Sequence, residues 1–100
     1  MLKTDTFYID RCLDGHPDDF RFLVQRYQGA LIGHLVSKLG SLDSAEEAAQ
    51  ESFVRAYFKV NTLKKPESFF AWLLGIGDLH TETIDKAALD KLEKNIMQTK

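Results

Sequence analysis

The sequence predicts an all-α fold, a compact bundle of about four to five helices in a single domain. Apolar residues recur every three to four positions through most of the chain, which is the helical period. No segment alternates apolar and polar residues as a half-buried strand would. The 100 residues are 44% hydrophobic and 28% charged, a composition that suits one modest hydrophobic core.

The first two helices are expected over residues 5–14 and 18–39. Pro17 suits a first helical position, where its missing N–H costs nothing, and Gly40 is expected to end the second helix. The second helix carries one apolar stripe, made of Phe20, Leu23, Val24, Tyr27, Leu31, Leu35 and Leu39.

A third helix is expected from Ser44 to about Val60, because Ser44 and Glu47 have capping-box spacing. Its inner side is expected to consist of Ala45, Ala49, Phe53, Ala56, Tyr57 and Val60. Its outer side carries Glu47, Gln50, Glu51, Val54, Arg55 and Phe58. Val54 and Phe58 form an apolar pair among charges, which indicates either a partner site or a surface covered by another helix of the domain.

Residues 61–65 are expected to form a loop, and Pro66 opens a further helix. Phe69 and Trp72 lie on its apolar side and are expected to be mainly core. Gly75 and Gly77 weaken this helix, so a bend or break is expected near residue 78. The domain core is expected over residues 5–80, with a last amphipathic helix or tail over 81–100.

Charge is uneven along the chain. The net charge of −2 and the pI near 5.9 argue against a strongly basic nucleic-acid binder. The one basic segment is 50–77, where Arg55, Lys59, Lys64 and Lys65 outnumber two acids and lie among aromatic residues. Cations beside rings suit single-stranded nucleic acid, but the composition alone favours core rings with solvated lysines.

The sequence gives no evidence for catalysis, for binding of a cofactor or metal, or for secretion or membrane insertion. We expect no catalytic residue, no cofactor and no metal site: Cys12 and His16 are four apart, but Gly15 and Pro17 break the helix that would align them. The single cysteine suits a reducing compartment. No signal peptide is evident, and the longest apolar run has nine residues against the ~20 of a membrane span. We therefore expect a cytoplasmic protein without a membrane contact that is not an enzyme.

Four stretches, in order, resemble a known family. They are RCLDGHPDDF at 11–20, FLVQRY at 22–27, DSAEEAAQESFVRAY at 43–57 and PESFFAWL at 66–73. Together they resemble the second conserved region of bacterial sigma factors, in particular the extracytoplasmic-function group. The third stretch is the most specific, with an acidic helix start, Gln-Glu, and a Phe two residues further on.

The resemblance implies a sigma-factor region-two fold and two contacts in transcription initiation. One is with the clamp helices of the largest subunit of core RNA polymerase, through Glu47, Gln50, Glu51, Val54, Arg55 and Phe58. The other is with the melted non-template strand of the upstream promoter element. Its expected residues are Lys59, Asn61, Thr62, Lys64, Lys65 and Phe70.

The chain also departs from that family. Relatives usually carry a basic residue where Phe70 stands, and polar residues where Gly75, Gly77 and Asp78 stand; Glu82 and Asp85 follow. No region-four helix-turn-helix is expected before Lys100. An alternative function is therefore a sigma-like interaction domain that binds polymerase or an anti-sigma factor without reading DNA. A helical scaffold without any link to polymerase is a third possibility.

Overall fold

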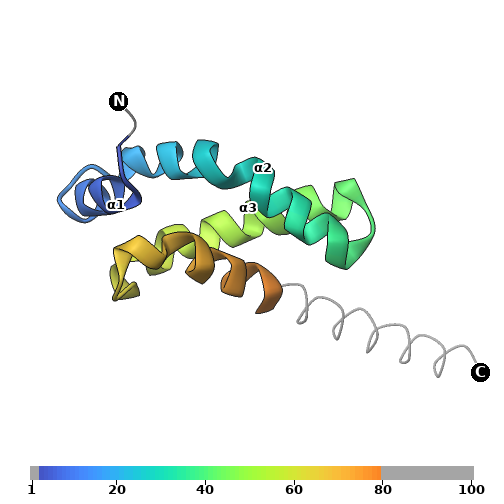
Figure 1. Ribbon diagram of the computed structural model, residues 1–100. Helices are drawn as coiled ribbons and strands as arrows, with labels where there is room; N and C mark the ends of the chain where they lie inside the picture. Colours follow the sequence, from blue (N-terminus) through green and yellow to red (C-terminus); the bar gives the residue numbers. More distant parts are fainter. Residues whose placement is uncertain (1–2, 80–100) are drawn as a thin grey trace, which may run out of the picture.

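The computed structural model describes residues 3–79, and these residues form a helical bundle (Figure 1). The elements in order are α1 (Asp5–Leu13), η1 (Pro17–Asp19), α2 (Phe20–Leu39), α3 (Leu42–Lys59), η2 (Val60–Thr62) and η3 (Pro66–Ser68). The chain is helical again over 69–79, which we call the last described helix. The described residues contain no strand, so the all-α prediction is confirmed. The predicted helix at 84–96 lies outside them.

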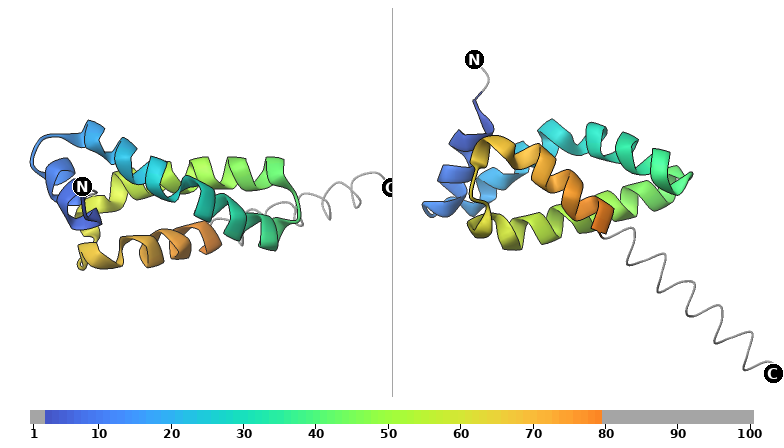
Figure 2. Two further views of the ribbon diagram at one scale, coloured as in Figure 1. Left: turned by 45° about the horizontal axis from the view of Figure 1, so that its top comes forward. Right: turned by 60° about the horizontal axis from the view of Figure 1, so that its bottom comes forward.

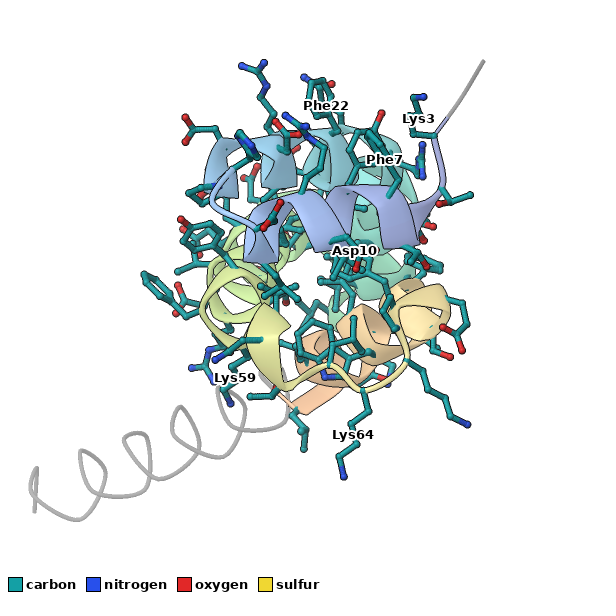
Figure 3. The ribbon with its side chains drawn as sticks, turned by 90° about the vertical axis from the view of Figure 1, so that its left-hand side faces the viewer. Lys3, Phe7, Asp10, Phe22, Lys59 and Lys64 are labelled. Atoms are coloured by element: carbon teal, nitrogen blue, oxygen red, sulfur yellow. The ribbon has the colours of Figure 1, made fainter. Side chains whose placement is uncertain are left out.

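Three helices run side by side, and α1 lies across one end of them. The chain passes along α2, turns back along α3 and turns again into the last described helix (Figures 1 and 2). Seen from the end that α1 covers, α1 appears side-on while the other helices recede from the viewer (Figure 3). The ends of the long helices therefore lie under α1.

Helix boundaries follow local capping chemistry, and two of them differ from the predictions. Gly40 ends α2 as expected, with a left-handed φ of 73° that suits glycine. The third helix begins at Leu42, not near Ser44, because the Ser41 hydroxyl caps it by accepting from the Ser44 backbone N–H. Pro17 opens a 3-10 turn, and the α-helix begins only at Phe20.

The core lies where α1, α2, α3 and the last described helix meet. Its fully buried large side chains are Ile9, Leu23, Leu31, Leu35, Phe69 and Leu73. On α3 the prediction was partly wrong: Tyr57 is 38% exposed, whereas Ala48 and Ser52 are buried. Small side chains bring α3 close to its neighbours, and the Ser52 hydroxyl is satisfied by donating to the Ala48 carbonyl at 2.6 Å.

The structure tests the predicted bend or break near residue 78 only in part: neither Gly75 nor Gly77 breaks the helix, which continues to residue 79, and the following residues lie outside the described part of the chain. Gly77 is buried, and a Cβ built there would lie 3.3 Å from Ser52 Oγ and 3.5 Å from Leu31 Cδ1. Glycine at this position therefore allows the last described helix to approach α2 and α3 closely. The close packing outweighs the low helix propensity of glycine, about 1 kcal/mol.

Candidate functional site

The outer face of α3 is open to solvent along its length. We call the set Glu47, Gln50, Glu51, Val54, Arg55 and Phe58 the α3 outer face, and all six residues are exposed. Val54 is 50% exposed and Phe58 74%. Within residues 3–79 no other helix covers Val54 and Phe58. The structure therefore excludes the alternative that another helix of the described bundle buries this apolar pair.

The charged groups of the α3 outer face are only loosely engaged with one another. Arg55 Nε lies 3.7 Å from Glu51 Oε1, one helical turn away, and both side chains are nearly half exposed. An exposed pair of this kind contributes little to stability. The Glu51 carboxylate and the Arg55 guanidinium therefore remain accessible to a partner.

A groove of ≈ 720 Å³ between α2 and α3 adjoins this face. Val24, Ile32, Ala49 and Phe53 supply its apolar part, Gln28 and Gln50 its amides, and Asp43, Glu46 and Glu47 its acids. The contribution of α2 to this groove was not predicted from the sequence. The available signal was the spacing of Val24, Gln28 and Ile32, which are four residues apart and so share one helix face.

The turns after α3 build a second surface. The Leu63 backbone N–H donates to the Val60 carbonyl at 3.1 Å, and the Ser68 N–H donates to the Lys65 carbonyl at 2.8 Å. Between these two turns lies a hollow of ≈ 580 Å³, which we call the loop hollow. It is lined by Thr62, Leu63, Lys64, Lys65, Ser68, Ala71 and Trp72.

Trp72 agrees with its prediction as mainly core, because it is partly buried and packs against the core. Its ring lies 6.0 Å, centroid to centroid, from the fully buried Phe69. Trp72 also lines the loop hollow, which was not predicted. The prediction that Phe69 is core is confirmed. Helical spacing did not separate the two rings, because both lie toward the apolar side of the last described helix.

The other residues expected at the strand-binding surface do not all lie together. Thr62, Lys64 and Lys65 line the loop hollow, but Asn61 lines a separate hollow beside Tyr57 and Phe58. Lys59 is exposed at the end of α3.

Phe70 lies apart from the loop hollow. Its ring stacks on Tyr27 of α2, with centroids 4.6 Å apart and planes 12° from parallel. The Tyr27 hydroxyl in turn donates to the Asp5 carboxylate, and burial together with this bond raises the pKa of Tyr27 to about 12. Phe70 therefore acts in packing between helices.

Asp78 faces α2, where it makes a hydrogen bond with His34 and an ion pair with Lys38. Its Oδ1 lies 2.8 Å from His34 Nε2 and 2.9 Å from Lys38 Nζ. Burial alone would raise the pKa of Asp78, but the hydrogen bonds from His34 and Lys38 outweigh it, so its pKa lies below the usual 3.8. This acid is held by two α2 side chains; Glu82 and Asp85 lie outside the described residues.

Residues 3–79 contain no group of three histidine, cysteine or acidic side chains placed to hold a metal ion. Burial raises the pKa of the Cys12 thiol, whose sulfur lies 3.9 Å from the Pro17 carbonyl oxygen. In the same part of the chain, no helix is long and apolar enough to cross a membrane.

Comparison with known proteins agrees with the resemblance to sigma factors. Residues 23–80 match the family model Sigma-70 region 2. The chain is 32% identical over 73 residues to an ECF RNA polymerase sigma-E factor of Haemophilus influenzae, a match that covers 73% of this chain and 38% of that protein. An RNA polymerase sigma-H factor of Pseudomonas aeruginosa is 29% identical over 74 residues, covering 74% of this chain and 38% of that protein. No solved structure matches the chain. The chain thus spans about two-fifths of the length of the curated relatives it matches.

Proposed function

The chain belongs to the sigma-70 region 2 family, and from that premise we propose that it binds core RNA polymerase and engages the melted non-template strand of the upstream promoter element. The role is non-enzymatic, and its domain core is proposed at residues 5–80. The α3 outer face is the proposed contact for the clamp helices of the largest polymerase subunit. The loop hollow, with Lys59 beside it, is the proposed contact for the strand.

One observation carries the polymerase contact: Val54 and Phe58 are exposed side by side on the α3 outer face, whose other groups are two acids, an amide and one arginine. Apolar groups ringed by charge are typical of a partner site. The adjoining groove adds Asp43 and Glu46, so the region suits a basic helix that carries apolar side chains.

A pull-down of the full chain on a fragment containing the polymerase clamp helices tests this contact. Glu51→Arg and Phe58→Ala should each weaken capture at least tenfold, because one reverses a charge and the other removes an exposed anchor. Glu67→Arg is the matched charge reversal, since Glu67 is exposed and lies outside both surfaces. Unchanged capture by Glu51→Arg and Phe58→Ala, with native circular dichroism, would reject the α3 outer face.

A second candidate function is binding to polymerase or to an anti-sigma factor without reading DNA. Its support is that Phe70 stacks on Tyr27, which leaves Trp72 as the one aromatic side chain among the described residues that lines the loop hollow. Binding to the clamp-helix fragment, together with no binding to a single strand of promoter sequence at low salt, would favour this candidate.

A further inference from the structure

Aromatic rings in contact with one another connect α2 to the loop hollow. The Tyr27 ring of α2 stacks on Phe70, and it also lies 5.8 Å from Phe69, centroid to centroid, with the planes 38° apart. The Phe69 ring in turn lies 6.0 Å from the ring of Trp72, which lines the loop hollow. A series of ring contacts therefore runs from Tyr27 to Trp72.

The Tyr27 ring is held from α1 as well as from the last described helix. Its hydroxyl donates a hydrogen bond to the Asp5 carboxylate, and Arg26 Nη1 lies 2.7 Å from Asp5 Oδ1. The side chains of Asp5 and Arg26 are largely buried. A carboxylate that accepts both a neutral and a charged hydrogen bond in such a setting keeps a fixed position. Tyr27 is therefore held at its hydroxyl by Asp5 and at its face by Phe70.

The first turn of the last described helix depends on packing for its orientation. No side-chain hydrogen bond caps η3, the turn that leads into this helix. Phe69, Phe70 and Trp72 fall within one turn of the helix, which takes about 3.6 residues. A rotation of the helix that displaces Phe69 and Phe70 therefore also displaces the indole of Trp72.

We propose that Tyr27 is a positioning residue for the loop hollow: its stack on Phe70 sets the rotation of the last described helix that places Trp72 at the hollow. Its effect on strand binding rests on the proposed strand contact, because the indole can stack on a base only where the strand passes. Tyr27 is not among the residues that line the groove between α2 and α3 or form the α3 outer face. Capture by the polymerase fragment should therefore not depend on it.

The test compares Tyr27→Leu, which removes the ring, with Tyr27→Phe, which keeps the ring and loses only the hydroxyl. Acrylamide quenching of fluorescence reports the exposure of the indole without any ligand, because Trp72 is the single tryptophan of the chain. Tyr27→Leu should raise the quenching constant and weaken binding of a short single strand of promoter sequence about tenfold, the effect of one lost base stack. Tyr27→Phe should lie closer to the wild type than to Tyr27→Leu in both measurements.

Two further variants separate the stack from a general loss of stability. Phe70→Leu removes the other ring and should have the same effects as Tyr27→Leu. Because the two rings act through one contact, the double variant should weaken strand binding no more than either single variant. Leu39→Ala is the control, since Leu39 is partly buried against the core at the other end of α2. It should leave the quenching constant and the strand affinity unchanged, at a temperature where circular dichroism shows native helix content for every variant.

The outcomes separate this inference from the proposed function. Strand binding that responds to Lys64→Gln/Lys65→Gln but not to Tyr27→Leu overturns the positioning role and leaves the loop hollow intact. Equal weakening of strand binding and of capture by the clamp-helix fragment in Tyr27→Leu also overturns it, because the loss is then general. A wild-type chain that does not bind the strand at low salt rejects the proposed strand contact. The quenching constant of Tyr27→Leu then decides the placement of Trp72 by itself: a raised constant supports it, and an unchanged constant overturns it.

Discussion

The α3 outer face and the loop hollow adjoin in sequence but present contrasting chemistry. The first is a regular helix surface with an exposed apolar pair and an excess of acid. The second has two lysines and one indole around an apolar hollow, and its residues come from two turns and a helix. The helix surface depends on side-chain spacing alone, whereas the hollow depends on how the last described helix packs. Substitutions in the core should therefore disturb the strand contact more than the polymerase contact.

The largest expected effect is on the free energy of unfolding, when Phe→Ala is made in the core beside the loop hollow and, for comparison, on the α3 outer face. Phe69→Ala should lower the free energy of unfolding by about 3–5 kcal/mol, because Phe69 is fully buried beside Trp72. Phe58→Ala should change it by less than about 0.5 kcal/mol, since Phe58 is 74% exposed. Thermal melts followed by circular dichroism give both values; equal losses would contradict the assignment of one ring to the core and the other to a surface.

Substitution of the two glycines of the last described helix should change the free energy of unfolding in opposite directions. Gly77→Val should lower it by about 1–3 kcal/mol, because the valine side chain would clash with Ser52 and Leu31. Gly75→Ala should raise the free energy of unfolding by up to about 1 kcal/mol, because Gly75 is exposed and no atom lies within 4 Å of a Cβ built there. Chemical denaturation measures both, and a stabilising Gly77→Val would show that this helix does not pack closely.

A smaller effect is expected when the loop hollow loses its charge. Lys64→Gln/Lys65→Gln should lower the salt slope for single-stranded DNA by about 1.4 and leave capture by the clamp-helix fragment unchanged. Binding of duplex DNA should be the weakest of all, since few cations cluster here. Anisotropy with single- and double-stranded oligonucleotides checks this, and tight, salt-insensitive binding of duplex would refute it.

The smallest effect concerns acid stability at the far end of the last described helix. The pKa of Asp78 is lowered in the folded chain, so its ion pairs with His34 and Lys38 stabilise the fold above the ordinary pKa of 3.8. That contribution is lost as the pH falls through the lower, folded-state pKa. Melting temperatures of the wild type and Asp78→Asn should therefore converge as the pH is lowered from 5 to 3; a constant difference would count against the ion pairs.

The helices and their order could be predicted from sequence because periodicity and capping are local. The predicted start of α3 at Ser44 lies two residues after its observed start at Leu42, since Ser41 and Ser44 both suit a cap and only the end of α2 at Gly40 decides between them. Gly77 looked like a helix breaker because its neighbours Ser52 and Leu31 are distant in sequence.

The two candidate surfaces also differ in how far they could be predicted from the sequence. The six residues of the α3 outer face follow from a helical wheel, and all six are exposed. The loop hollow could not be predicted without the tertiary structure. Phe70 was predicted to face the strand but stacks on Tyr27, and Trp72, which was predicted as mainly core, packs against the core and also lines the hollow. Nothing local distinguishes these rings, since their burial depends on what α2 and the turns place beside them.

The separateness of the two surfaces is tested most directly by NMR. The isotopically labelled full chain is titrated first with the clamp-helix fragment and then, in a fresh sample, with a short single strand of promoter sequence. The account predicts backbone shifts within residues 24–32 and 43–58 for the fragment, and shifts within 59–72 with the Trp72 indole N–H for the strand. Shifts of the same residues by both ligands, or an indole N–H that moves with the fragment and not with the strand, would contradict it.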